Sequence, residues 1–234
     1  MNVRTIAKLP LLTELPVEDL NQLLDSAAIE LAPKGTVLFE QGGKATKLHL
    51  VIKGAVELYA RHSEKECGIM LLRRGDVFMP AAALYNEPYL NSARTLSPTQ
   101  LLLLDIPAVR RLALANPTFG QRISRVLAGH FRMCVRQIVD LKCRPPAERL
   151  AAFLLRLVDS TKGVAELPMP KRQLAARLGM APETLSRALS KIADHGLLVQ
   201  GHLIVVRDRE RIEAFCSEET YYRNNEGALD VHAL

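Results

Sequence analysis

The feature that most constrains this chain is a pair of short predicted helices within residues 170–196. Leu174 and Leu178 stand four residues apart, so they share one face of the first helix. Gly179 follows the last apolar position, where a left-handed residue ends a helix at little cost. Pro182 suits the first turn of the next helix, because its missing N–H would have no partner there. The pattern predicts a helix-turn-helix.

The exposed face of the second helix carries residues suited to reading DNA bases. Leu185 and Leu189 form its buried face, while Glu183, Ser186 and Arg187 at i, i+3 and i+4 project from one patch. Arginine can bond guanine O6 and N7 together, glutamate can accept from cytosine N4, and serine suits several bases. The alternative is a solvated helix face with an intrahelical ion pair.

A family resemblance rests on several stretches in the same order. Val199–Val206 is β-rich around Gly201 and predicts a hairpin, which would make this unit a winged helix. Pro182–Arg187, with its Glu-x-x-Ser-Arg form, resembles the recognition helix of Fnr-type members of the Crp/Fnr transcription regulators. Ala147–Ala151 resembles the start of their DNA-binding domain. The resemblance covers residues 10–216. It implies a dimeric regulator whose partners are double-stranded DNA and RNA polymerase.

The region from Leu31 to Ile106 predicts an all-β roll. Short β-rich runs are separated by glycines, and several sit where tight corners favour positive φ: Gly35, Gly42, Gly54 and Gly75. The spacing resembles the cyclic-nucleotide-binding β-roll of the same family. Residues 9–31, ahead of it, hold helical spacing.

The expected fold class is α+β, with four segments along the chain. A cyclic-nucleotide-binding-like β-roll with an N-terminal helix occupies residues 1–116, and a dimerisation helix occupies 117–142. A winged helix-turn-helix domain occupies 143–216, and residues 217–234 form an acidic tail expected to be disordered. Pro145-Pro146 breaks any helix, so the linking segment 142–146 is expected to be a hinge.

The resemblance also suggests which residues line the effector pocket. In nucleotide-binding members a Gly-Glu pair holds the ribose and an Arg-Ser/Thr pair holds the cyclic phosphate. The matching positions here are Met79 and Pro80, then Asn91 and Ser92. A phosphodiester buried without a cationic partner costs several kcal/mol. Cyclic AMP is therefore not expected to be the effector.

The long predicted helix carries a coiled-coil-like seam, which by resemblance is the dimer interface. Its apolar and half-polar positions recur at three- and four-residue steps: Ile123, Leu127, His130, Cys134, Ile138 and Leu141. Two symmetric helix-turn-helix units would then reach half-sites about one DNA turn apart.

Charge supports DNA as the partner. Residues 142–216 hold 13 Lys and Arg against 8 Asp and Glu, as phosphate binding requires. The expected phosphate contacts come from both helices and the wing: Lys171, Arg172, Arg177, Thr184 and His202. By resemblance the half-site is of the TTGAT type.

The cofactor remains unknown from the sequence. Fnr itself holds an iron–sulfur cluster on cysteines near its N-terminus, whereas this chain has no cysteine before Cys67, so a cluster is disfavoured. Haem stays open, as does redox chemistry at Cys67 or Cys143. The conceivable haem ligands are His49, His62, His130 and Met79, although a structural role is the simpler interpretation of each.

Other function classes find no support. There is no apolar run long enough to span a membrane and no signal-peptide pattern, so a cytoplasmic location is expected. Phosphate-loop, nucleophile-elbow and metal-hydrolase motifs are absent from the sequence, which argues against an enzyme. The alternative left open is a ligand-binding β-roll protein that acts through protein partners.

Overall fold

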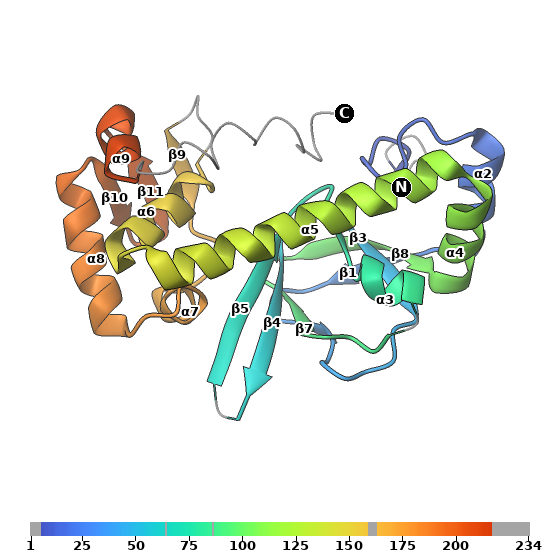
Figure 1. Cartoon of the computed structure of the whole chain (residues 1–234), viewed down its shortest axis with the longest axis horizontal. Helices are drawn as coiled ribbons and strands as arrows, with labels where there is room; N and C mark the ends of the chain where they lie inside the picture. The colour runs from blue at the N-terminus through green and yellow to red at the C-terminus, as the bar shows by residue number, and fades with distance from the viewer. Residues whose placement is uncertain (1–5, 64, 86, 159–162, 217–234) are drawn as a thin grey trace. The chain divides into compact units, whose positions relative to one another are not determined.

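The computed structural model describes residues 6–63, 65–85, 87–158 and 163–216 (Figure 1). The chain divides into two compact units, of which the first runs to Arg132 and the second starts at Met133. The predicted disordered tail, residues 217–234, lies outside the described residues. Across the described segments, every helix is too short or too polar to cross a lipid bilayer.

The first unit is the predicted β-roll. Two four-stranded antiparallel sheets form it, with strand orders β1-β8-β3-β6 and β2-β7-β4-β5. The strands are β1 (Ala28–Ala32), β2 (Val37–Phe39), β3 (Lys47–Lys53), β4 (Val56–His62), β5 (Lys65–Leu72), β6 (Val77–Phe78), β7 (Ser92–Thr95) and β8 (Thr99–Asp105). The helices are α2 (Val17–Leu24), α3 (Pro80–Tyr85), α4 (Ile106–Ala115) and the start of α5 (Pro117–Cys143).

Alternation along β3 and β8 decides how the roll is packed. Leu48 and Leu50 of β3 and Leu102 and Leu104 of β8 are buried on one face of the first sheet. They share a core cluster with buried residues of α2, α4 and α5, namely Leu20, Leu23, Val109, Leu112, Phe119, Ile123 and Val126. The opposite face of that sheet is left for the interior of the roll.

The glycine corners are confirmed. Gly35, Gly42, Gly54 and Gly75 all have φ between +82° and +95°. Gly54 is also sterically required, because a Cβ there would lie 2.5 Å from Thr99 Oγ1 and 2.6 Å from the Pro98 carbonyl oxygen.

The helical interpretation of residues 9–31 is right only in part. Helix α2 covers Val17–Leu24, whereas Ala28–Ala32 is strand β1, paired antiparallel with β8. Hydrogen bonding to β8 makes this segment a strand, although the local spacing of leucines favours a helix. Ile29 and Leu31 are 43% and 75% exposed, whereas Glu30 between them is half-buried, so the apolar residues of this strand do not mark a buried face.

The second unit is a winged helix-turn-helix, as predicted. Its helices are the end of α5, α6 (Pro146–Leu155), α7 (Lys171–Arg177), α8 (Pro182–Asp194) and α9 (Arg209–Cys216). A three-stranded sheet, ordered β10-β11-β9, forms the wing from β9 (Val164–Glu166), β10 (Leu197–Gln200) and β11 (Leu203–Val206). Gly201 turns the β10–β11 hairpin with φ +60°.

Candidate DNA interface and effector pocket

Helix α8 is held by its apolar face. Leu185, Ala188 and Ile192 are at most 4% exposed, at helical spacing, and α8 packs on α6. Gly179, with φ +60°, turns the chain between α7 and α8, and Gly196, with φ +86°, follows the end of α8. This packing fixes which face of α8 points to solvent.

The opposite face of α8 presents the three candidate base readers. Glu183, Ser186 and Arg187 are all exposed. In the described part of the chain, no ion pair engages Glu183 or Arg187, so the intrahelical pair considered above is not formed. The Ser186 hydroxyl donates to the Pro182 carbonyl oxygen at 3.1 Å. Both charged side chains therefore extend into solvent from the first turns of the helix.

The candidate phosphate contacts are placed less uniformly. Lys171 and Arg172 at the start of α7 are exposed, as is His202 in the wing turn, and Thr184 is half-buried. Arg177 is half-buried, with its guanidinium 5.4 Å from the centroid of the Phe153 ring. Arg177 thus packs partly inside its own domain, which leaves less of it for DNA.

Two of the residues assigned to the dimer seam face their own chain. Ile123 is 2% exposed within the core of the roll, so it is not available to a partner helix. Burial lowers the pKa of His130, and a hydrogen bond with the backbone of Val77 opposes that shift, which places the imidazole against β6. The helical period alone could not separate these two apolar faces of α5.

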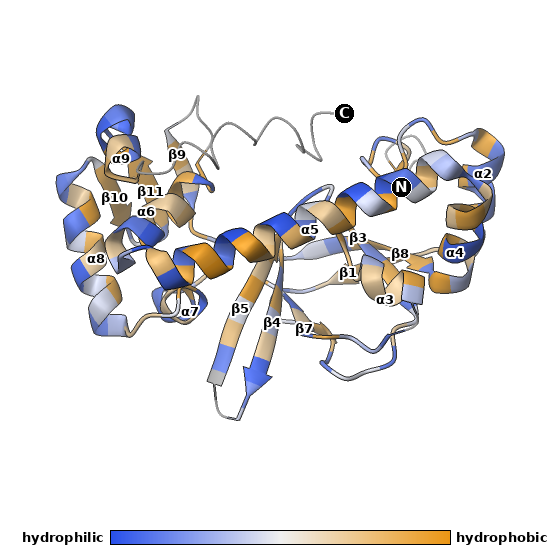
Figure 2. Cartoon of the chain, viewed as in Figure 1, coloured by the Kyte–Doolittle hydropathy of each residue, from blue (hydrophilic) through white to orange (hydrophobic). Residues whose placement is uncertain are grey.

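The other four residues assigned to the seam, together with Phe131, lie on a more exposed line along α5, although Leu127 also packs partly against the core of the roll. Leu127, Phe131, Cys134, Ile138 and Leu141 follow one another at steps of four and three residues, the spacing of a coiled-coil seam. Phe131 is 70% exposed, Ile138 52% and Leu141 43%. Figure 2 shows hydrophobic residues recurring along this helix. We refer to these five residues as the open seam.

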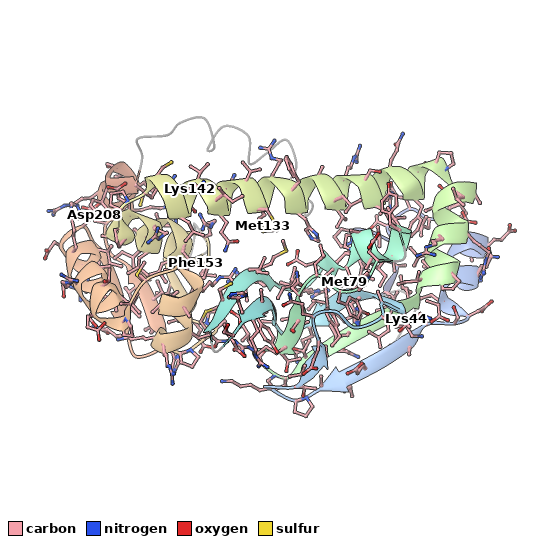
Figure 3. The ribbon with its side chains drawn as sticks, turned by 60° about the horizontal axis from the view of Figure 1, so that its bottom comes forward. Lys44, Met79, Met133, Lys142, Phe153 and Asp208 are labelled. Atoms are coloured by element: carbon pink, nitrogen blue, oxygen red, sulfur yellow. The ribbon has the colours of Figure 1, made fainter. Side chains whose placement is uncertain are left out.

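The candidate effector residues lie at the start of α3 and the start of β7. Met79 has φ +67°, a left-handed conformation that favours glycine, and Pro80 is buried in the first turn of α3 (Figure 3 labels Met79). The Ser92 hydroxyl accepts the Gln41 backbone N–H at 3.0 Å. Among the described residues, Asn91 Oδ1 is buried without a hydrogen-bond partner. None of these four side chains is cationic.

An ion-pair network on the second sheet was not identified from the sequence. Arg94 on β7 donates two hydrogen bonds to Glu57 Oε2, at 2.9 and 3.0 Å, and one to Glu66 Oε2 at 2.8 Å. Glu57 is fully buried, and Arg94 also lies 4.3 Å from the Tyr59 ring centroid. Hydrogen bonds from Arg61 and then Arg94 hold the pKa of Glu66 below its usual value. The Arg94 charge is therefore already balanced by carboxylates.

His49 forms part of an aromatic cluster in the roll. Its ring stacks on Phe78 at 4.8 Å between centroids and lies 5.2 Å from Phe39, which stacks on Tyr89 at 3.9 Å. Burial lowers the pKa of His49 to about 4, only partly opposed by a hydrogen bond with the Lys47 backbone. His49 is thus a neutral core residue at physiological pH.

The remaining candidate sensor residues are dispersed. His62 is exposed at the end of β4, and Cys67 and Cys143 are exposed free thiols. Within the described segments, no three His, Cys, Asp or Glu side chains gather to hold a metal ion. Burial raises the pKa of the Cys216 thiol to about 11, which makes it a poor nucleophile at neutral pH.

Comparison with known proteins identifies both domains. Residues 29–116 match the cyclic nucleotide-binding domain model, and residues 148–215 match the Crp-like helix-turn-helix domain model. The Cyclic AMP receptor protein of Thermus thermophilus is 29% identical over 193 residues, which cover 82% of this chain and 89% of that protein.

Two solved structures are similar over most of their length. One, from Ruegeria pomeroyi and named for cyclic nucleotide binding, is 31% identical with a TM-score of 0.64, covering 93% of this chain and 98% of that one. FixK2 from Bradyrhizobium japonicum is 26% identical with a TM-score of 0.74, covering 83% and 99%.

The buried state of His49 predicts a specific pH dependence of stability. Because the folded-state pKa is about 4 and the unfolded value is 6.5, the unfolded chain binds the proton first as pH falls. The stabilisation is complete above pH 6.5 and is lost as pH falls toward 4. Between pH 7 and 5 this loss is roughly 2 kcal/mol. Denaturant unfolding of the parent and of His49→Phe at both pH values should show a smaller change for the variant; equal changes would contradict the assignment.

Proposed function

We propose that this chain, which belongs to the Crp/Fnr family of transcription regulators, works as a homodimer that binds an inverted repeat with TTGAT-type half-sites. Its relatives are transcription regulators, so the chain is a regulator rather than an enzyme. The observation that supports the proposal best is the exposed row of Glu183, Ser186 and Arg187 on a helix whose other face is fully packed. The proposed partners are double-stranded DNA and RNA polymerase, in the cytoplasm of a bacterium.

Each side chain of the row has a distinct proposed role. Arg187 bonds guanine O6 and N7, Glu183 accepts from cytosine N4, and Ser186 contacts a neighbouring base. Lys171, Arg172, Thr184 and His202 contact phosphates, with Arg177 in a lesser role, since it already packs on Phe153. Phosphate contacts fix the register of the helix on the duplex, and base contacts carry the sequence preference.

The open seam of α5 is the proposed dimer interface. Its exposed large side chains, Phe131, Ile138 and Leu141, would be buried by the same residues of a second chain. This isologous pairing would present two α8 helices to the two halves of an inverted repeat.

A charge placed in the open seam should produce monomers. Phe131→Glu puts a carboxylate where a partner helix would pack, yet Phe131 is 70% exposed in the single chain, so the fold should persist. Arg125→Glu, on an exposed position away from the seam, is the control. Sedimentation should give a monomer for the first variant and a dimer for the second. A dimer in both cases would remove the open seam as the interface.

The proposed signal is not a cyclic nucleotide, although the domain matches the cyclic nucleotide-binding model. Pro80 and Asn91 replace the glutamate and arginine that nucleotide-binding members use, and the Ser92 hydroxyl is bonded to Gln41. Arg94, on the same strand as Ser92, is balanced by Glu57 and Glu66. A cyclic phosphate would therefore be buried without a free cation to pair it.

Calorimetry tests the effector proposal directly. Titration of the dimer with cyclic AMP and cyclic GMP should give no tight binding, and neither nucleotide should change the affinity for DNA. The Cyclic AMP receptor protein of Thermus thermophilus serves as the positive control in the same cell. Micromolar or tighter binding by this chain would reject the proposal.

Two arginine variants separate base reading from phosphate binding. Arg187→Ala should weaken the specific palindrome by roughly 1–3 kcal/mol and lose preference at the guanine, with non-specific binding nearly intact. Arg172→Ala should weaken all duplexes about equally and reduce the salt dependence by about one charge. Titrations of the palindrome and a guanine-substituted duplex at two salt concentrations measure both effects.

The same titrations can contradict the proposal at two levels. If Arg187→Ala discriminates between the duplexes as well as the parent does, Arg187 is not the base reader. If the parent itself binds no Fnr-like palindrome, with or without candidate effectors, the β-roll acting through protein partners becomes the better function.

A further inference from the structure

The junction between α5 and α6 is interrupted in the backbone but bridged by side chains. Helix α5 ends at Cys143 and α6 begins at Pro146, as the Pro145-Pro146 pair dictates. A segment of this kind is expected to be a hinge. The Asp140 carboxylate on α5 nevertheless pairs with Arg144 and Arg156, which flank α6, and Arg149 on α6 donates to the last carbonyls of α5. All of these residues lie in the second unit.

Asp140 is the centre of these contacts. It is 5% exposed, one turn before the end of α5. Its Oδ1 lies 3.0 Å from Arg144 Nε, and its Oδ2 lies 3.6 Å from an Arg156 guanidinium nitrogen. A carboxylate near a helix C-terminus is unfavourable alone, because that end carries partial negative charge. The arginines that flank α6 offset this and so tie the two helices together.

Arg149 closes the end of α5 from the other side. It is 7% exposed in the middle of α6, and its Nη1 donates to the carbonyl oxygens of Asp140 and Leu141, at 3.2 and 3.1 Å. The last carbonyls of a helix have no partner within it, so these bonds satisfy groups that water would otherwise have to reach. Burial lowers the pKa of Arg149, and the charge of Asp140 opposes that shift.

The same helix end also contacts the helix-turn-helix. A Cβ added to Gly179, in the turn between α7 and α8, would lie 2.9 Å from Leu141 Cδ2. Helix α6 in turn packs on α8. Figure 3 labels Lys142 at the end of α5 and Phe153 on α6. The end of α5 therefore contacts both α6 and the turn before α8, and α6 contacts α8 itself.

We propose that the ion pairs of the Asp140 carboxylate with Arg144 and Arg156 make the Pro145-Pro146 junction a rigid coupling rather than a hinge, with Asp140 acting as a positioning residue for α8. The Arg149 bonds to the last carbonyls of α5 support the same coupling. The end of α5, α6 and the recognition helix α8 then move together as one rigid body. Arg144 and Arg156 act through Asp140 and have no base-reading role. This inference rests on the proposed DNA-binding function.

Asp140→Asn in the full-length dimer separates two explanations, because a pure charge effect and a loss of positioning change the affinity for the palindrome in opposite directions. Removing a negative charge from a basic domain tightens DNA binding if charge alone matters. Loss of positioning instead weakens the specific palindrome, by on the order of tenfold, and leaves non-specific binding unchanged or slightly tighter. Asp105→Asn, which removes the ion pair of Asp105 with Lys47 in the β-roll, is the matched control and should leave both affinities unchanged.

Amide hydrogen exchange measures the rigidity of the junction in the absence of DNA. The Arg149 N–H donates to the Pro145 carbonyl and the Arg144 N–H to the Asp140 carbonyl, at 3.0 and 3.3 Å. Both amides should exchange faster in Asp140→Asn than in the parent, with the dimer mass unchanged. Arg144→Gln is a milder second variant, and Asp140→Asn/Arg144→Gln should bind the palindrome no more weakly than Asp140→Asn alone.

Tighter binding of both duplexes by Asp140→Asn, or unchanged exchange at the two amides, would overturn the coupling. A parent that does not prefer the palindrome would instead defeat the proposed function, and the exchange measurement would still decide whether the junction is rigid.

Discussion

Helix α5 buries one apolar face within its own chain and leaves apolar residues of a second face exposed. Phe119, Ile123 and Val126 complete the core of the β-roll. Phe131 and Ile138 remain exposed in the single chain. The remaining parts of the molecule depend on this division, because the helix enters the sensor core at one end and carries the DNA-binding domain at the other. A single apolar stripe could not serve both purposes.

The sequence was most informative where local chemistry decides the backbone. Gly179, Pro182 and Gly196 mark the limits of α7 and α8, and Gly54 marks a corner that tolerates no side chain. Strand β1 escaped detection because Ile29 and Leu31 are exposed and its hydrogen bonds come from β8, far along the chain. The Glu57–Arg94 pair escaped for the same reason, since only sheet register brings the two residues opposite each other.

The sequence predicts the functional side chains of the helix-turn-helix more completely than those of the roll. The proposed base readers Glu183 and Arg187 need exposure and spacing, both of which follow from a helical pattern. An effector pocket needs the relative placement of residues from several strands. His49 illustrates the difference. In the sequence it is a candidate ligand for a haem iron, whereas in the structure it stacks on Phe78 and its burial keeps it neutral.

The way α5 completes the sensor core also limits how such regulators can be recombined. A sensor module cut at the end of α4 would expose the partners of Phe119, Ile123 and Val126 and lose a side of its core. Gene fusions that exchange sensors must therefore carry several turns of the long helix with the roll. The working crossover point lies inside a continuous helix, where the heptad phase has to be kept, and not at the loop that precedes it.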